Sequence, residues 1–189
     1  MTLILASTSA IRRQMLDAAG VEYDAVKPDV DEGELRLGLS VSSEIALRLA
    51  SAKALSVPGA WVIGSDSVVR SAGRHFTKPD SRDEAAEHLR FFSGRSMELT
   101  SAVALAHGEV LDWSHVETTV LEVRRLSDAF ISDYLDAEWP EVGYTVGVFR
   151  LEGRGVQLFD RIDGDHFTIL GMPLLPLLGA LRDRGLVPA

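Results

Sequence analysis

The most informative part of the sequence is the segment Ile63-Gly64-Ser65-Asp66-Ser67-Val68-Val69. Together with the apolar residues that precede it from Trp61, it predicts a buried β-strand. An aspartate in such a strand is costly to bury unless a cation, a metal ion or hydrogen-bond donors stabilise its charge. The simplest interpretation is that Asp66 caps a turn at the end of the strand. A functional interpretation depends on the cationic residues elsewhere in the chain.

Composition limits the classes of function. A chain of 189 residues fits one domain or two closely fused halves, and its hydrophobic fraction of 46% is ordinary for a globular protein. The net charge of −9 disfavours nonspecific binding to nucleic acid or to anionic lipid, but a local cluster of cations could still bind a small polyanion. The absence of cysteine excludes disulfides and thiolate metal sites.

The beginning of the chain shows no targeting pattern. Residues 1–6 lack a basic region, and their apolar run is too short for a signal peptide. No apolar stretch of the sequence has the length of a membrane span. Together with the lack of cysteine, these features predict a cytoplasmic location.

The first predicted strand, Leu3-Ile4-Leu5-Ala6, is followed by the hydroxyl residues 7–9 at the start of a helix that ends at Gly20. Arg12 and Arg13 lie in the first turn of this helix, where the helix dipole favours acidic side chains instead. Two cations beside exposed backbone N–H groups and hydroxyls predict an anion-binding site. The alternative is a solvated pair of arginines.

The remaining segments predict a mixture of helices and strands. The acidic residues between Asp29 and Glu34 suggest a solvated loop, and His88 is expected on the surface of a helix. Because helices and strands alternate irregularly and hairpins are included, the predicted class is α/β with a mixed sheet flanked by helices. Helices are expected to start at Ser42 or Ser43, Ser81, Ser127-Asp128 and Pro173, and strands at 97–106, 110–123, 144–151 and 156–162.

Seven segments carry a resemblance to a known family. They are residues 5–13 (LASTSAIRR), 49–54 (LASAKA), 63–69 (IGSDSVV), 78–79 (KP), 93–95 (SGR), 152–155 (EGRG) and 171–174 (GMPL). In this order, and over nearly the whole chain, they resemble the Maf family. Proline is usual in that family where this chain has Ala10.

The resemblance implies a fold, an activity and a cofactor. The implied activity is that of a nucleoside triphosphate pyrophosphatase, which hydrolyses a nucleoside triphosphate to the monophosphate and pyrophosphate with a divalent metal, Mg²⁺ or Mn²⁺. The implied fold is a single elongated α/β domain at residues 1–189, similar to inosine triphosphatases, with two lobes around a central cleft. A homodimer is a further expectation, and neither nucleic acid nor membrane is expected as a partner.

Three positions linked to substrate choice in the family fall at Ile11, Ser67 and Glu152. The type that acts on dTTP and UTP has Arg, Thr and Gln there, whereas the type that acts on 7-methyl-GTP has Trp, Gln and Glu. Glu152 therefore matches the 7-methyl-GTP type, and the other two positions match neither type. Residues 158–164 also look more like the 7-methyl-GTP type.

The resemblance also implies roles for single residues. Asp66 is expected to act as the general base for the attacking water, to hold the metal, or both, and Glu32 is the second acid expected near the metal. The side chains expected to bind the phosphates are Ser7, Ser9, Arg12, Arg13, Lys53 and Lys78. Two other functions stay open: a nucleotide-binding regulator of cell division and septum formation that hydrolyses little, and a pyrophosphatase of the dTTP/UTP type.

Overall fold

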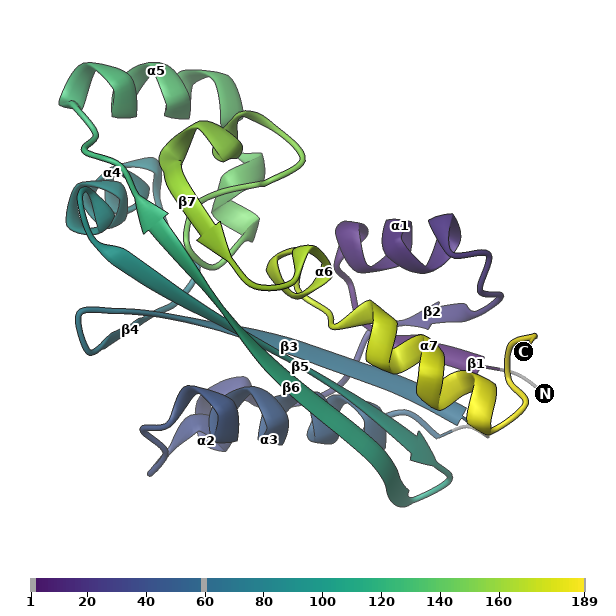
Figure 1. The fold of residues 1–189 in the computed structure, drawn as a ribbon. Helices are drawn as coiled ribbons and strands as arrows, with labels where there is room; N and C mark the ends of the chain where they lie inside the picture. Colours follow the sequence, from purple (N-terminus) through teal and green to yellow (C-terminus); the bar gives the residue numbers. More distant parts are fainter. Residues whose placement is uncertain (1–2, 59–60, 189) are drawn as a thin grey trace. The chain divides into compact units, whose positions relative to one another are not determined.

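The computed structural model describes residues 3–58 and 61–188 (Figure 1). Within these ranges, the strands form a seven-stranded mixed sheet in the order β2-β1-β3-β5-β6-β7, with β4 paired to β3. This confirms the predicted α/β class. The described residues divide into two compact units: a first unit within Met1–Ser67, Thr100–Thr118 and Asp165–Ala189, and a second unit of Val68–Leu99 and Thr119–Gly164.

Three parallel strands organise the first unit. They are β1 (Leu3–Ala6), β2 (Asp24–Val26) and the first part of β3 (Trp61–Ser71). β1 lies between the other two, and Ala6 is paired with Val26 on one side and with Gly64 on the other. The carboxyl ends of β1 and β2 therefore lie level with Gly64 of β3, two residues before Asp66.

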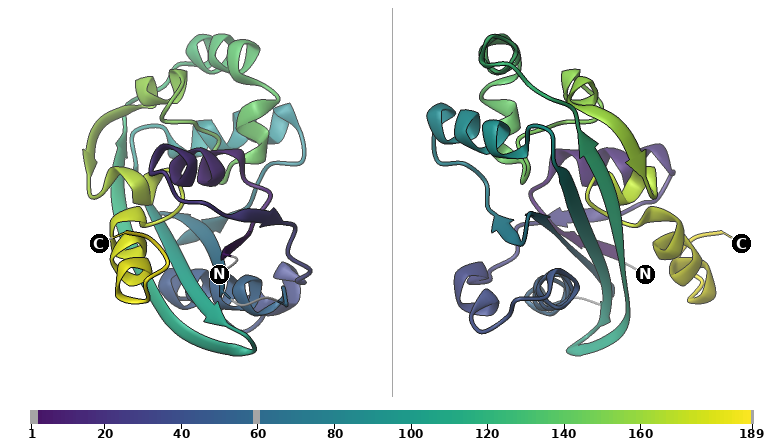
Figure 2. Two further views of the ribbon diagram at one scale, coloured as in Figure 1. Left: turned by 90° about the vertical axis from the view of Figure 1, so that its right-hand side faces the viewer. Right: turned by 60° about the vertical axis from the view of Figure 1, so that its left-hand side comes forward.

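The helices of the first unit cover both faces of these strands. α1 (Ala10–Ala18) connects β1 to β2, and α2 (Glu32–Arg36) and α3 (Ser42–Leu55) connect β2 to β3. Since the two connections run in opposite directions along the sheet, right-handed crossovers place α1 and α3 on opposite faces. Figures 1 and 2 show α1 on the same face as α7 (Leu174–Asp183), and α2 and α3 on the other face.

The alternation of strand side chains gives each face its own core. Leu5 and Ile63 point to the face covered by α1 and α7, whereas Ala6 and Val62 point to the face covered by α3. At Gly64 the strand and α3 touch directly, because a Cβ there would lie 2.1 Å from the carbonyl oxygen of Ala50. A glycine at this position lets α3 approach β3 closely.

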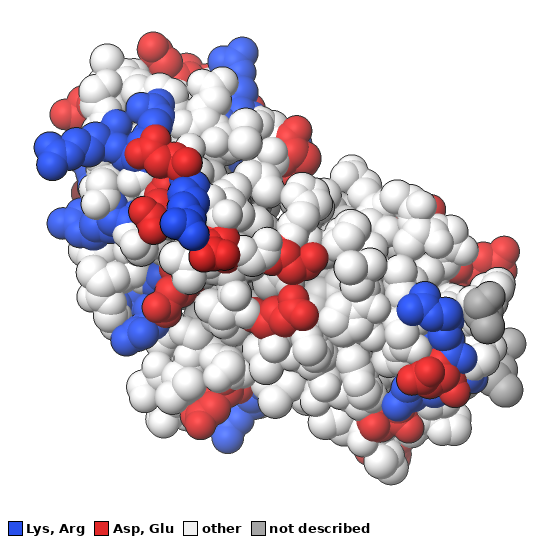
Figure 3. All heavy atoms as spheres, viewed as in Figure 1, with Lys and Arg blue, Asp and Glu red and all other residues white. Residues whose placement is uncertain are grey.

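The second unit contains one end of each long strand: residues 68–71 of β3, residues 96–99 of β5 (Ser96–His107) and residues 119–123 of β6 (Val110–Val123). β4 (Arg74–Phe76) pairs antiparallel with β3, and β7 (Phe159–Asp163) pairs antiparallel with β6. Its helices are α4 (Arg82–Phe92), α5 (Asp128–Glu138) and the 3₁₀ turns Glu141–Tyr144 and Arg154–Leu158. Basic and acidic side chains alternate over α4 and α5 (Figure 3), and Arg90 of α4 pairs with Asp128 of α5 at 2.6 Å.

Several helix starts are confirmed by their caps. The side chains of Ser9, Ser81 and Ser127 each accept a hydrogen bond from the backbone N–H group three residues later, which satisfies a donor that has no partner within the helix. The helix predicted from Ser42 or Ser43 begins at Ser42. Pro173 precedes the first residue of α7.

The predicted strand pair at 144–151 and 156–162 is wrong. Residues 145–153 contain no strand, and β7 begins only at Phe159 and pairs with β6. The apolar run is broken because Gly147 and Val148 have positive φ values of 88° and 59°, which a strand does not accommodate. Val148 and Phe149 are buried nevertheless, so their apolar character reflects the core of the second unit.

Two smaller predictions are also wrong. The acidic segment expected to be a loop contains the short helix α2, whose N-cap is Asp31 and whose first turn carries Glu32 and Glu34. Acidic side chains at a helix start interact favourably with the helix dipole. His88, expected on the surface, is buried and packs edge-on against Phe76 with ring centroids 5.0 Å apart.

Candidate active site

Asp66 lies inside β3 and points to the face covered by α3. Its Oδ1 atom accepts a hydrogen bond of 2.6 Å from the Nζ atom of Lys53, and both side chains are buried. Lys53 lies on the last turn of α3, next to Ala54, whose backbone contacts Gly64. The close approach of α3 to β3 thus brings the lysine to the aspartate and stabilises the buried negative charge.

Two residues of α2 extend this pair. The same Nζ atom of Lys53 lies 2.7 Å from Oε1 of Glu32. A guanidinium nitrogen of Arg36 lies 3.7 Å from Oδ2 of Asp66 and 4.0 Å from Oε2 of Glu32. Glu32, Arg36, Lys53 and Asp66 therefore form a charge cluster in which two cations alternate with two carboxylates.

Arg36 is the member of the charge cluster that sequence reasoning missed. It lies four residues after Glu32, and oppositely charged residues at this spacing face each other on a helix. The pattern Glu-x-x-x-Arg could have indicated both the helix and the pair. The interpretation of residues 29–34 as a loop concealed it.

One oxygen of the charge cluster has no hydrogen-bond donor. Oδ2 of Asp66 is buried and receives no hydrogen bond from residues 3–58 or 61–188. Buried polar atoms are normally paired, and an exception calls for an explanation. An ionised carboxylate oxygen in this situation is suited to accept a proton or to bind a divalent cation, since hard cations prefer oxygen ligands.

The opposite face of β3 carries a different arrangement around Arg12. Its Nε atom donates to the carbonyl oxygen of Gly171 at 2.9 Å, and Nη1 donates to the carbonyl oxygen of Ser65 at 2.9 Å. Nη2 donates to Oγ of Ser67 at 3.2 Å. We call this set the Arg12 network. It joins α1, β3 and the segment before α7.

The environment of Arg12 has opposing effects on its charge. Burial lowers the pKa of the guanidinium, and the negative charges of Asp66 and Glu32 oppose this effect. The serines of the network are themselves bonded: Oγ of Ser65 donates to a backbone carbonyl, and Oγ of Ser67 lies 2.9 Å from Oγ of Ser101. Arg12 thus has a structural role in the first unit. Its expected role in phosphate binding stays a prediction.

The loop between β1 and α1 is held by its own hydroxyl groups. Oγ of Ser7 accepts from the backbone N–H group of Ser9 at 3.1 Å, and Oγ of Ser9 accepts from that of Arg12 at 3.5 Å. Ser7 is buried, whereas Thr8 and Arg13 are exposed. The phosphate-binding roles expected for Ser7, Ser9 and Arg13 stay predictions.

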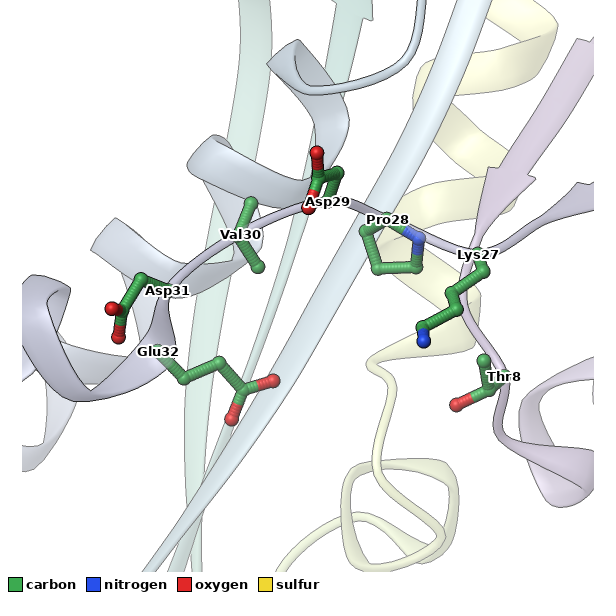
Figure 4. Close-up of a pocket in the computed structure, with 7 residues that line it drawn as sticks. All are labelled: Thr8, Lys27, Pro28, Asp29, Val30, Asp31 and Glu32. Carbon is green, nitrogen blue, oxygen red and sulfur yellow. The ribbon is translucent and has the colours of Figure 1, made fainter.

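A cavity of about 560 Å³ lies where β1 and β2 end, and it opens widely to the surface. Thr8 contributes to it from the loop after β1, and residues 27–32 contribute from the segment after β2. Figure 4 shows Lys27 and Thr8 on one side and Glu32 on the other, with the side chain of Asp31 pointing away. Because Glu32 also belongs to the charge cluster, the cavity and the cluster share a residue.

Two predicted site residues belong to the second unit. Lys78 follows β4 and is exposed. Glu152 lies in the loop between the two 3₁₀ turns, where Oε1 is 3.4 Å from Nε of Arg150. Arg150 lies in turn 4.0 Å from Oε2 of Glu138, a largely buried carboxylate. The acidic pair of Glu138 and Glu152 thus shares one arginine.

Ile11, the remaining position predicted to affect substrate choice, is partly buried on α1. Among the residues that the structure describes, no group of three or more His, Asp or Glu side chains forms a metal site. In the same residues, no helix is long and apolar enough to span a membrane.

Comparison with known proteins gives a consistent result. The family model "Maf-like protein" matches residues 2–184. A nucleoside triphosphate pyrophosphatase of Nitrobacter hamburgensis is 45% identical, with 98% of this chain and 95% of the relative covered. A 7-methyl-GTP pyrophosphatase of Rhizobium meliloti is also 45% identical, with 99% and 98% covered.

Among solved structures, a HAM1 protein from Coxiella burnetii matches 67% of this chain and 75% of its own length, with 20% identity and a TM-score of 0.45. The family model covers nearly the whole sequence, and the two relatives match over 95% or more of both chains. The chain is a member of the Maf family.

Proposed function

We propose that this protein is a nucleoside triphosphate pyrophosphatase, which hydrolyses the bond between the α- and β-phosphates. The observation that carries the proposal is the state of Asp66: one oxygen is bonded to Lys53, and the other is buried without a hydrogen-bond donor among the described residues. A carboxylate fixed in this way has one oxygen left for chemistry. Relatives that are 45% identical over 95% or more of their own length carry the name of this activity.

The reaction needs a base and charge stabilisation. Asp66 accepts a proton from the water whose oxygen attacks the α-phosphorus. The bond from this phosphorus to the bridging oxygen breaks, and pyrophosphate leaves with the electron pair. Lys53 orients the carboxylate, since its ammonium group lies 2.6 Å from Oδ1. The negative charge that develops on pyrophosphate is stabilised by cationic side chains, as is usual for phosphoryl transfer.

The residues present fit a divalent metal. Asp66 and Glu32 would hold it, because both are carboxylates of one charge cluster and Oδ2 of Asp66 lacks a donor from the described chain. Two carboxylates suffice for Mg²⁺, which is commonly held by one or two protein carboxylates together with substrate phosphates. When bound, such an ion would neutralise phosphate charge and increase the reactivity of the phosphorus centre.

The finer proposal concerns the base. We propose that the substrate is a modified guanine nucleotide such as 7-methyl-GTP. Support comes from the carboxylate at Glu152, which can accept hydrogen bonds from N–H donors on the Watson–Crick edge of guanine. One of the relatives with 45% identity is named for 7-methyl-GTP, whereas others carry the generic name. Lys78 is proposed as a further phosphate contact.

Replacing the carboxylate tests this specificity. In Glu152→Gln, an amide that both donates and accepts replaces a group that only accepts, so kcat/KM should fall more for 7-methyl-GTP than for UTP. The measurement is the ratio of the two kcat/KM values for the wild type and the variant. An unchanged ratio would contradict the assignment of Glu152 to the base and would leave the hydrolytic proposal intact.

The activity itself is tested by screening nucleoside triphosphates for release of pyrophosphate, with Mg²⁺, with Mn²⁺ and with a chelator. The expected result is equimolar monophosphate and pyrophosphate from at least one substrate, lost in the chelator. Release of inorganic phosphate would point to a different bond. Binding of a nucleotide without turnover would favour the regulatory alternative.

A further inference from the structure

Lys27 is a cation for which the sequence motifs provide no role. It follows β2 directly, and among the described residues that line the cavity it is the one basic side chain. The other charged residues of the lining are Asp29, Asp31 and Glu32. In an acidic chain, a lysine placed in the wall of a cavity is the feature that a bound anion would require.

The position of the cavity supports binding of a ligand. In open α/β sheets, ligands bind in the crevice outside the carboxyl ends of the strands. The cavity lies beyond the carboxyl ends of the neighbouring strands β1 and β2, because the residues that line it follow these ends. Thr8 and Lys27 follow these two strand ends, so both lie at this point of the fold.

The two walls of the cavity have complementary chemistry. One wall offers the ammonium group of Lys27 and the hydroxyl group of Thr8, both able to donate hydrogen bonds to an anion (Figure 4). The other wall offers Glu32, which belongs to the charge cluster with Asp66. A triphosphate that carries a divalent cation presents phosphate oxygens and a positive ion together, and it can satisfy both walls at once.

The local backbone favours a fixed position for this lysine. Lys27 precedes Pro28, and a residue before proline is restricted to extended conformations. Its flexible side chain then supplies a positive charge from a backbone of restricted conformation, as lysines commonly do in phosphate sites. We propose that Lys27 is a substrate-positioning residue that binds a non-bridging oxygen of the triphosphate, next to Thr8. This inference rests on the proposed function and adds a contact specific to this cavity.

The test compares Lys27→Gln, Lys27→Arg and the control Arg48→Gln, which removes an exposed cation from α3 in the same unit. In Lys27→Gln, KM for the best triphosphate should rise on the order of tenfold, as expected for the loss of one charge-assisted hydrogen bond, with kcat changed less than about threefold. Lys27→Arg should recover most of the affinity. Arg48→Gln should resemble the wild type.

Calorimetric titration of the same proteins with Mg²⁺-pyrophosphate provides a readout independent of turnover. The affinity should fall on the order of tenfold in Lys27→Gln only, since this variant alone lacks the contact. Equal KM and equal pyrophosphate affinity in Lys27→Gln and the wild type would overturn the inference, as would a wild type that binds no pyrophosphate. If the wild type binds pyrophosphate but hydrolyses no triphosphate, the proposed function fails while the titration still decides the role of Lys27.

Discussion

The two faces of β3 around Asp66 differ in how completely their polar groups are paired. On the face of Ser65 and Ser67, the Arg12 network joins one guanidinium to two carbonyl oxygens and a hydroxyl group. On the face of Asp66, the charge cluster brings four ionised side chains together and leaves one buried oxygen without a donor from the described chain. Adjacent residues of β3 therefore differ in role: Ser65 and Ser67 belong to a hydrogen-bonded framework, and Asp66 belongs to the charge cluster.

The difference indicates that the first face has a structural role and the second face a catalytic role. A cation whose donors are bonded to backbone carbonyls fixes the elements that it joins, and a substitution removes a donor from each of those carbonyls. A carboxylate with one bonded and one unpaired oxygen is fixed in place but not saturated. Functional groups held by a rigid and fully bonded framework are a general feature of active sites. We expect substitutions on the first face to reduce stability and substitutions on the second face to reduce turnover.

The largest expected effect is the loss of turnover in Asp66→Asn. The amide keeps the shape of the carboxylate but cannot act as a base or balance the charge of Lys53. Losing one such electrostatic contribution costs about 2.7–4 kcal/mol in the barrier, so kcat should fall at least roughly a hundredfold. Initial rates of pyrophosphate release measure this fall, and Asp24→Asn, at an exposed position of β2, is the matched control. Turnover within threefold of the wild type would remove Asp66 from the mechanism.

The next effect is a loss of stability in Arg12→Lys. Lysine keeps the charge but lacks the planar fork that reaches Ser65, Ser67 and Gly171 together. We expect the free energy of unfolding to fall by about 1–3 kcal/mol, the cost of a buried polar group that loses its donor, since the carbonyl oxygen of Ser65 loses Nη1 of Arg12. The carbonyl oxygen of Gly171 still accepts from the hydroxyl group of Ser65. Denaturant unfolding measures this value. Equal stability of variant and wild type would show that the network is not structural.

The comparison also shows which part of the molecule the sequence could predict. Periodic apolar residues and serine caps identified β1, α1, α4 and α5, because these signals are local. Lys53 and Asp66, which come from two of the segments that carry the family resemblance, form an ion pair, whereas their roles in the reaction stay predictions. The partners of Arg12 were not predictable, since Gly171 is 159 residues away along the chain and accepts through its backbone.

Local patterns failed where the backbone departs from regular structure. The apolar residues around Val148 suggested a strand, but positive φ values there exclude a ladder, and burial accounts for their composition. α2 has only five residues, too few for a periodic apolar pattern, so the spacing of Glu32 and Arg36 was the one local signal of this helix. The homodimer, the cytoplasmic location and the central cleft between two lobes stay predictions.

A smaller effect is expected from Arg36→Gln. A guanidinium nitrogen of Arg36 lies 3.7 Å from the unpaired Oδ2 of Asp66, so its charge should compete there with a divalent ion. Removing its charge should lower the Mg²⁺ concentration for half-maximal activity by roughly three- to fivefold, which corresponds to about 1 kcal/mol, the scale of a partly exposed ion pair. A Mg²⁺ titration of the rate measures it. Arg36→Lys should keep the wild-type midpoint, and an unchanged or higher midpoint in Arg36→Gln would exclude the competition.

The smallest expected effect tests whether a buried unpaired atom alone marks an active site. Nδ1 of His88, on α4 of the second unit, is buried and also lacks a hydrogen-bond partner among the described residues. Its surroundings are the rings of Phe76 and Phe92, and the nearest carboxylate, Glu84, lies 3.7 Å from Nε2. Burial lowers the pKa of His88 below its ordinary value of 6.5, with Glu84 opposing this effect. We therefore expect a role in stability and none in turnover.

The sign of the pH dependence follows from this lowered pKa. Below pH 6.5 the unfolded chain binds a proton at His88 before the folded chain does, so this residue reduces the stability of the folded protein as pH falls from 6.5 toward the folded-state pKa. His88→Gln cannot titrate, and the difference in Tm between wild type and variant should therefore shift in favour of the variant between pH 7.5 and pH 5.5. Parallel Tm curves would contradict the assignment. A fall in turnover at pH 8 would show that a buried unpaired atom marks a residue needed for turnover in the second unit as well. The unpaired oxygen of Asp66 would then no longer distinguish its face of β3 as the catalytic one.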